Sequence, residues 1–417
     1  MSPANDTGAA VVANPGGLRW LRLMATGLAR AGLLRAYMTP VAASEERFER
    51  RIKWMPRAVS SPVEKGLRRR PIPSGVNEER IERLATIPEL LYASSLRLPG
   101  LARISPRLGS WRSGLFDGGV SRRLRPSDQA VVVESAAALK TLTRARELSI
   151  KSFLDHPIIH HRVAAEILEG EARREPEFAP TLQYADLDPV LARQLDDELR
   201  IADRVFAMCS FHRWSLVEGG VDESKIIFTP LGVDLDLFRP HAPPEDETFR
   251  VLFVGQLSQR KGLSYLLEAF SMAGIPNSEL LLHGRIVARR KPWEGQPGVR
   301  YVPLMPYTDL PALYASCDVF VLPSLAEGFA QTPLEAMACG RPVIISEHTF
   351  ADDVIADEAN GFIVPIRDSA AIADRLRQLH ADPELRVQVG EAARRRAEHF
   401  SWRRYQERVV SALTDSA

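Results

Sequence analysis

The segment between residues 319 and 345 constrains the fold of this chain more than any other part of it. The run Val319-Phe320-Val321-Leu322 is apolar without alternation and rich in β-branched and aromatic residues, which is typical of a parallel strand buried on both faces. A short helix over 332–339 follows, with Thr332 as N-cap and Glu335 completing a capping box. Another apolar run covers 343–345. Strand, loop, helix and strand in this order predict a doubly wound α/β sheet, which binds ligands at the carboxyl ends of its strands.

Two glutamates, Glu327 and Glu335, lie on this loop and helix. The segment resembles retaining glycosyltransferases of family 4, whose nucleotide-sugar site carries two glutamates with seven residues between them. Gly255, the pair Lys261-Gly262 and the run 318–324 agree with the family pattern. The resemblance covers roughly residues 200–400 and is faint before about 125. Taken singly, Glu335 could be a helix-capping residue and Glu327 a solvated loop residue. Their occurrence together, with the flanking residues in the order of the family pattern, favours a functional role.

The resemblance implies the GT-B architecture: α/β, with two Rossmann-like doubly wound parallel-sheet domains that face each other across a cleft. A chain of 417 residues is also too long for one ordinary core. Residues 241–248, with two prolines and three acids, predict the linker. We expect an acceptor-binding domain at 1–243, a donor-binding domain at 244–398, and a last helix within 399–417 that crosses back onto the first domain.

The individual strands and helices follow from the apolar pattern. In the first half, residues 9–13 form a short strand and residues 18–34 a helical pattern, separated by Gly16 and Gly17. These glycines would let a backbone approach a ligand closely, and a simple tight turn explains them equally well. Further elements of the first half are expected at 77–98 (helix), 129–134 (strand), 136–146 (helix), 150–154 (strand), 187–202 (helix), 204–208 (strand), 210–219 (helix) and 225–229 (strand). The second half predicts strands at 249–254, 279–283, 299–302, 319–322, 343–345 and 362–364, and helices at 263–272, 310–316, 332–339, 369–380, from 383 onward, and 402–413.

The resemblance assigns the catalytic residues. Glu327 would lie beside the donor sugar, and Glu335 would accept hydrogen bonds from the ribose hydroxyls of the donor. His156 follows the strand at 150–154, where the family places a histidine that faces the sugar. The nearby His160 and His161 leave that assignment open, as does a hydrogen-bonded structural role for His156. We therefore predict Glu327 and His156 as catalytic residues.

The diphosphate of the donor would lie at the loop after residues 249–254. Lys261 would bring a cation to it beside a helix N-terminus. Gln256 occupies a position where the family commonly has arginine, so it can donate hydrogen bonds but adds no charge. Arg260 is a candidate replacement, and a plain surface pair is the alternative for Arg260 and Lys261. The other predicted donor contacts are Gly16, Gly17, Gly255, Gly284, Arg285, Gly328, Phe329 and Ala330, the last at a position where the family often has glycine.

Neither a cofactor nor a metal ion is expected. Two Asp-x-Asp sequences occur, but Asp186-Leu187-Asp188 opens a predicted helix and Asp234-Leu235-Asp236 precedes the linker. A cation and a helix N-terminus can stabilise a leaving diphosphate without a metal. The expected donor is a UDP-, GDP- or other nucleotide-linked hexose, transferred with retention of its anomeric configuration as the resemblance implies.

Composition limits the partners and the compartment. The net charge of +1 gives no reason to expect nucleic acid. Three widely spaced cysteines fit a reducing compartment. The N-terminus lacks the pattern of a signal peptide, and no apolar run approaches the roughly 20 residues that cross a bilayer. We therefore expect a cytoplasmic protein.

The segment from Arg47 to Arg70 is strongly basic, with nine Arg or Lys residues against two Glu and with Phe48, Ile52 and Trp54 among them. Such charge usually marks a solvated face. The alternative is peripheral contact with the anionic inner face of a membrane, which suits an acceptor from the cell envelope, either a lipid-linked sugar or a growing polysaccharide.

Two other function classes remain to be weighed. A nucleotide-dependent oxidoreductase or epimerase is disfavoured because the sequence lacks a Gly-x-Gly-x-x-Gly fingerprint. A non-catalytic GT-B protein that binds a nucleotide sugar or acts as a scaffold is argued against by Glu327 and Glu335, while Gln256 keeps it open.

Overall fold

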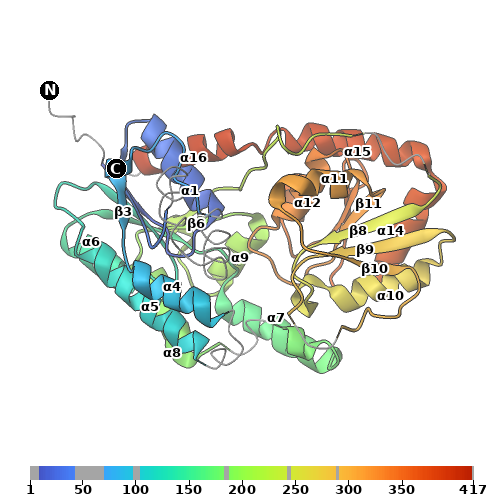
Figure 1. Ribbon diagram of the computed structural model, residues 1–417, viewed down its shortest axis with the longest axis horizontal. Coiled ribbons are helices and arrows are strands. Elements are labelled where there is room, and N and C mark those ends of the chain that lie inside the picture. The colour runs from blue at the N-terminus through green and yellow to red at the C-terminus, as the bar shows by residue number, and fades with distance from the viewer. Residues whose placement is uncertain are drawn as a thin grey trace, which may run out of the picture.

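The computed structural model describes residues 9–42, 70–96, 104–182, 187–241, 246–287 and 291–415. Within them the chain forms two parallel sheets, each flanked by helices, which lie side by side in Figure 1. The predicted α/β class with two Rossmann-like domains is confirmed. The proposed boundary at 243/244 lies outside the described residues, as do all residues of the basic segment 47–70 except Arg70.

The first sheet has seven strands in the order β3-β2-β1-β4-β5-β6-β7, and every neighbouring pair is parallel. Its strands are β1 (Ala10–Ala13), β2 (Leu34–Thr39), β3 (Ile81–Arg83), β4 (Ala130–Glu134), β5 (Lys151–Asp155), β6 (Arg204–Ala207) and β7 (Ile226–Phe228). Its helices are α1 (Arg19–Arg30), α4 (Thr86–Ser95), α5 (Ser105–Ser121), α6 (Leu139–Glu147), α7 (His161–Arg174), α8 (Pro189–Ile201) and α9 (Ser210–Glu218). The direction of the winding reverses between β1 and β4, which places a topological switch point at the ends of these two strands.

The second sheet has six parallel strands in the order β10-β9-β8-β11-β12-β13, with the switch point between β8 and β11. Its strands are β8 (Phe249–Val254), β9 (Ser278–His283), β10 (Val299–Val302), β11 (Val319–Leu322), β12 (Val343–Ser346) and β13 (Phe362–Val364). Its helices are α10 (Leu263–Ala273), α11 (Leu310–Ala315), α12 (Gln331–Ala338), α13 (Ala351–Val354), α14 (Ser369–Ala381) and α15 (Pro383–Ala397). The central strands β8 and β11 are almost entirely buried, as their apolar runs predict.

The last helix, α16 (Trp402–Asp415), returns to the first domain and packs on α1, as predicted (Figure 1). Gln406 donates to the backbone oxygen of Leu23 over 3.0 Å, and Arg30 donates to Gln406 over 3.2 Å. The chain therefore ends on the domain in which it begins.

Helix α7 makes a second connection between the domains. It belongs to the first sheet in sequence but extends below the second domain in Figure 1. Its buried Glu171 accepts hydrogen bonds from Gln259 (2.7 Å) and Tyr265 (2.8 Å) of the second domain and forms an ion pair with Arg367 (2.8 Å). Nothing in the sequence analysis predicted α7 or this contact.

Two expected helices of the first domain were wrong in part. Residues 77–98 were expected as one helix, but 81–83 form the edge strand β3 and the helix begins only at Thr86. The helical pattern over 18–34 ends at Arg30, because Gly32 adopts a left-handed conformation (φ 73°) and the chain enters β2 at Leu34.

Candidate active site

Two loops at the switch point of the second sheet pack tightly against each other. The loop after β8 carries residues 255–262, and the loop after β11 carries residues 323–330. Leu325 donates from its backbone to the oxygen of Arg260 over 2.9 Å. A side chain at Gly262 would collide with the backbone of Pro323, and Gly262 also has φ 73°. Glycine is therefore required where these loops meet.

The loop contact brings the predicted Glu327, Arg260 and Lys261 together. One carboxylate oxygen of Glu327 lies 2.7 Å from a guanidinium nitrogen of Arg260 and 2.6 Å from the Lys261 ammonium. Burial would raise the pKa of Glu327, but the two cations outweigh it and hold that pKa below its ordinary value. Burial lowers the pKa of Lys261. Two cations and one ionised carboxylate leave the cluster with one net positive charge, which suits an anion.

The first domain reaches this cluster through the loop after β5. His156 is fully buried, and burial together with His212 and two further histidines holds its pKa far below the ordinary value, so the ring is neutral at pH 7. The next residue, Pro157, lies against Gly328, where a side chain would collide with the Pro157 backbone. Cys209 also donates to the Gly328 oxygen over 3.1 Å. The carboxyl edges of the two sheets therefore meet at the glutamate loop.

Several buried polar atoms around this meeting point have no hydrogen-bond partner among the described residues. They are both ring nitrogens of His156, Nε2 of Gln256 and Nε of Arg260. Buried polar groups without partners are costly and rare in folded proteins. Their concentration beside the net positive cluster fits a polar, anionic ligand.

Glu335 does not form the predicted capping box. Helix α12 begins at Gln331, and its N-cap residue, Ala330, makes no side-chain bond. The carboxylate of Glu335 accepts hydrogen bonds from the hydroxyls of Tyr307 (3.0 Å) and Tyr314 (2.9 Å). Burial raises the pKa of Glu335 to about 7, although the two tyrosines oppose this shift.

Arg19 from the first domain completes the surroundings of Glu335. Its guanidinium lies 4.7 Å from the ring centroid of Tyr307 and forms an ion pair with Asp234 over 3.3 Å. Sequence reasoning missed Arg19, Tyr307 and Tyr314. Position alone could have indicated Arg19, because it opens the helix after Gly16 and Gly17, at a sheet edge where ligands bind.

The remaining donor candidates of the second domain line the same edge. Gly284 has φ 150°, and a side chain there would collide with the backbone of Gly255, so the ends of β8 and β9 touch. Arg285 is exposed, and its oxygen accepts from Leu257 over 3.0 Å. Phe329 is buried against Phe350, with ring centroids 4.9 Å apart, so its side chain supports the loop.

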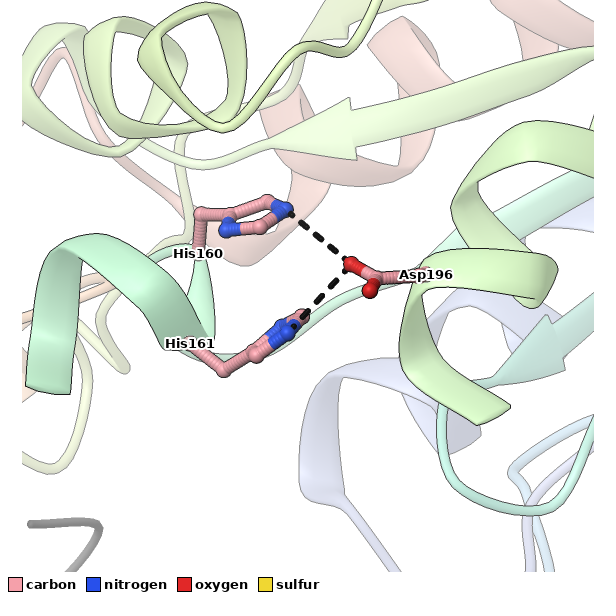
Figure 2. A group of neighbouring side chains, drawn as sticks. All are labelled: His160, His161 and Asp196. Atoms are coloured by element: carbon pink, nitrogen blue, oxygen red, sulfur yellow. Dashed lines mark ion pairs between the residues drawn. The ribbon is translucent and has the colours of Figure 1, made fainter. Parts of the chain in front are cut away.

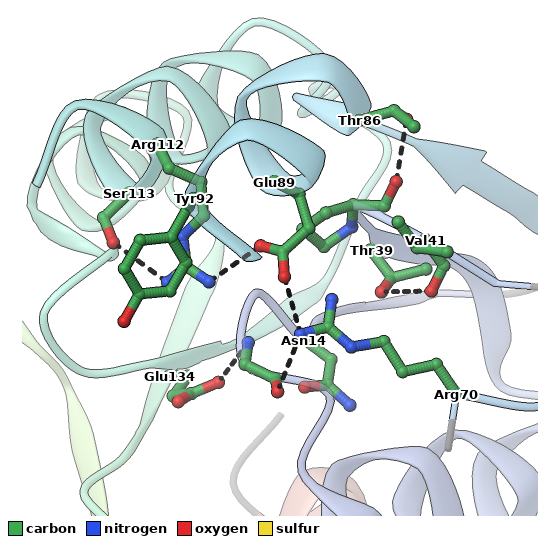
Figure 3. Close-up of polar contacts among 12 residues, drawn as sticks. Asn14, Thr39, Val41, Arg70, Thr86, Glu89, Tyr92, Arg112, Ser113 and Glu134 are labelled. Atoms are coloured by element: carbon green, nitrogen blue, oxygen red, sulfur yellow. Dashed lines mark hydrogen bonds and ion pairs between the residues drawn. The ribbon is translucent and has the colours of Figure 1, made fainter. Parts of the chain in front are cut away.

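Gly16 and Gly17 lie at the other switch point, at the end of β1. The Gly16 amide donates to Glu134 over 3.0 Å, and the nearby Arg70 forms an ion pair with Glu89 of α4 over 2.8 Å (Figure 3). Burial raises the pKa of Glu134 to about 7. Sequence reasoning missed Glu134, although a carboxylate as the last residue of a central strand is itself a signal.

One group of side chains among the described residues has the composition of a metal site. His160, His161 and Asp196 approach each other at the start of α7 (Figure 2). However, Nδ1 of His160 accepts the Arg162 amide over 3.3 Å, which places the proton on Nε2, the atom that faces Asp196. Arg162 also holds the second oxygen of Asp196 over 2.6 Å. We interpret the group as a hydrogen-bonded helix start.

In both Asp-x-Asp sequences, a described aspartate accepts a hydrogen bond from a nearby backbone amide. Asp188 caps α8 by accepting the Val190 amide over 2.7 Å. Asp234 accepts the Leu237 amide over 3.1 Å and pairs with Arg19. Asp186 lies outside the described residues.

Residues 236–396 match the family model described as glycosyl transferases group 1. The chain is 30% identical over 240 residues to D-inositol 3-phosphate glycosyltransferase of Arthrobacter sp. (strain FB24), covering 52% of this chain and 57% of the relative. It is 26% identical over 260 residues to O-antigen chain mannosyltransferase B of Escherichia coli, covering 57% and 66%. The chain thus spans less than two thirds of the length of these relatives.

Solved structures share the fold over the whole chain. Sucrose-phosphate synthase from Thermosynechococcus elongatus has a TM-score of 0.65 at 19% identity and covers 98% of this chain and 100% of its own. HepE of Anabaena, solved in complex with UDP-glucose, has a TM-score of 0.61 at 16% identity, with coverages of 97% and 99%. At this level of identity the likeness establishes the architecture of two facing domains.

Proposed function

We propose that this chain, whose residues 236–396 match the family model described as glycosyl transferases group 1, transfers a hexose from a nucleotide diphosphate sugar to a glycan acceptor. The anomeric configuration of the hexose is retained in this proposal. The observation that carries it is the ion-paired cluster of Glu327, Arg260 and Lys261 at the switch point, where the first domain brings His156 to the same loop.

The proposed reaction breaks the bond between the anomeric carbon and the diphosphate oxygen and forms a bond to an acceptor hydroxyl oxygen. The proton of that hydroxyl passes to the departing diphosphate. Arg260 and Lys261 stabilise the negative charge that develops on the leaving group, a task that preorganised cations perform well in a site with little water. No metal is required in this proposal.

The other residues hold the two ends of the donor. Glu335 accepts the ribose hydroxyls beside Tyr307 and Tyr314. His156, being neutral, donates a hydrogen bond to a sugar hydroxyl without adding charge, and Gln256 donates to the diphosphate. Glu335 and His156 are buried and Gln256 is half-buried, and His156 and Gln256 carry atoms without a partner among the described residues.

We place the acceptor on the first domain, beside Gly16 and Gly17. One relative is named for an O-antigen chain and another for inositol 3-phosphate, and both names support a hydroxyl-bearing acceptor of the kind found in envelope glycans or their precursors. The protein then works in the cytoplasm, at or near the inner membrane face.

A panel of nucleotide sugars tests this function. The purified protein is expected to be stabilised thermally by one of them, to hydrolyse it slowly without acceptor, and to do so in the presence of a chelator. Loss of turnover in chelator with recovery in magnesium or manganese would contradict the metal-free site. No selective response to any nucleotide sugar would overturn the function itself.

A non-catalytic nucleotide-sugar-binding protein is the second candidate, because Gln256 supplies no charge where the family commonly has arginine. This candidate predicts selective thermal stabilisation without hydrolysis or transfer. The same panel therefore distinguishes the two.

A further inference from the structure

Large apolar side chains are exposed along two neighbouring helices of the first domain, α4 and α5. Ile87, Leu90 and Leu91 of α4 are 71%, 42% and 49% exposed. Ile104, Trp111 and Leu115 of the α5 segment are 42%, 46% and 42% exposed. The two helices pack on each other, and Figure 1 shows them side by side along the lower side of the first domain.

These side chains form one stripe on each helix. Ile87, Leu90 and Leu91 have the spacing i, i+3 and i+4, and Ile104, Trp111 and Leu115 have the spacing i, i+7 and i+11. Each set therefore lies on one helical face. We name these six residues the α4–α5 surface. Large apolar side chains that gather on exposed helical faces often mark a contact with a partner or a membrane.

The exposed charged side chains of α4 and α5 themselves are of one sign. The acids of the two helices, Glu89 and Asp117, are buried, 4% and 3% exposed, and both are bonded internally. The exposed charges on and beside α5 are cations, Arg107, Arg122 and Lys140. Apolar side chains including a tryptophan, flanked by cations and without exposed acids in these helices, match the interface of an anionic bilayer.

The inner side of α4 leads directly to the proposed acceptor site. The buried Glu89 bridges Arg70 (2.8 Å) and Arg112 (2.8 Å). Arg70 lies over the Gly16–Gly17 loop at the end of β1 (Figure 3). One helix thus separates the exposed apolar surface from the edge of the sheet.

We propose that the α4–α5 surface docks this protein on an anionic lipid bilayer, so that the head group of a lipid-linked acceptor enters the site beside Gly16 and Gly17. The lipid-linked acceptor rests on the proposed function, whereas the docking itself does not. None of the helices in the described part of the chain could span a bilayer.

Vesicle cosedimentation with the full chain tests the proposal. The vesicles contain phosphatidylglycerol and phosphatidylcholine in equal parts, and phosphatidylcholine alone serves as the neutral comparison. The test protein carries Leu90→Ser and Leu91→Ser together, and a second carries Trp111→Ser. The matched control carries Val190→Ser and Val387→Ser, which are 75% and 58% exposed elsewhere. All four substituted side chains of these two double variants are exposed, so each variant should keep the unfolding temperature of the parent.

The parent and the control are expected to bind anionic vesicles, and the leucine double variant at least tenfold more weakly. High salt should weaken the parent's binding without abolishing it, because the apolar contact is not screened. Absence of binding by the parent would overturn the proposal, and so would equal binding by the leucine variant. A dimer of the parent that becomes monomeric in the leucine variant, with vesicle binding unchanged, would assign the surface to a protein contact. Vesicle binding without any sugar transfer would instead reject the proposed function alone.

Discussion

At the scale of single residues, the site depends on carboxylates whose surroundings set their charge. Glu327 is held ionised by two cations, whereas Glu335 is surrounded by tyrosines and has its pKa raised by burial to about 7. Two glutamates that look alike in the sequence therefore have different protonation states near neutral pH. The sequence pattern predicts that both belong to the site, but it cannot predict this difference, which arises from Tyr307, Tyr314, Arg260 and Lys261.

The raised pKa of Glu335 predicts a pH-dependent affinity for the donor. Below about pH 7 the free protein carries Glu335 protonated, and ribose hydroxyls that donate to it favour the ionised form. Affinity for the nucleotide sugar should therefore rise roughly tenfold from pH 6 to pH 8, as a single ionisation allows. Isothermal titration across this range measures it. The sugar-linked donor is used because its diphosphate does not itself titrate there.

The control for this experiment is Glu335→Gln, which should bind the donor more weakly and without the rise. An identical pH profile in the parent and in Glu335→Gln would show that Glu335 does not contact the ribose.

At the scale of elements, the sequence predicts strands better than it predicts helices and their partners. The runs at β8, β10, β11 and β13 end where the structure ends them. The unalternating apolar run of β11 is buried along its whole length, as expected inside a parallel sheet. Strand β2 was missed because it contains Arg35, which is buried against Asp128 at 2.9 Å. A charged residue such as Arg35 argues against a buried strand in the sequence, because the partner that neutralises it lies far away along the chain.

Helix α7, which the sequence analysis did not predict, provides a testable link between the domains. Glu171 is fully buried, and its removal leaves Arg367, Gln259 and Tyr265 without their shared acceptor. Glu171→Gln should lower the free energy of unfolding by about 2 kcal/mol, less than for a fully buried pair because Arg367 is partly exposed. It should also raise the KM for the donor more than it lowers kcat, because Gln259 belongs to the loop that carries Arg260 and Lys261.

Thermal unfolding and donor kinetics check this prediction, with Glu169→Gln, an exposed substitution on the same helix, as the control. If both variants behave like the parent, α7 does not hold the donor loop. A loss of stability with unchanged KM would confine Glu171 to a structural role.

At the scale of the whole molecule, the sequence predicts two domains and a helix that returns, but it does not predict how the domains touch. The returning helix α16 is found because the family resemblance implies it. The contact of Pro157 with Gly328 joins residues 171 positions apart, and no local pattern records it. The same holds for Arg19 beside Tyr307. The loops that form the site can therefore be predicted from the sequence. The contacts between the two domains at the site can be seen only in the folded chain.

The proposed function depends on the binding of the nucleotide-sugar diphosphate by Arg260 and Lys261, which Glu327 holds. Its most direct test is calorimetric titration of the matching nucleoside diphosphate into the parent, Lys261→Gln, Glu327→Gln and the exposed control Arg300→Gln. Lys261→Gln should bind about 10 to 100 times more weakly, since a charge-assisted hydrogen bond is worth about 1.5–3 kcal/mol. Glu327→Gln should bind at least as tightly as the parent, because both cations are released from their carboxylate, while its turnover falls by about 100-fold. Affinities of Lys261→Gln and Arg300→Gln that both equal the parent's would contradict the account.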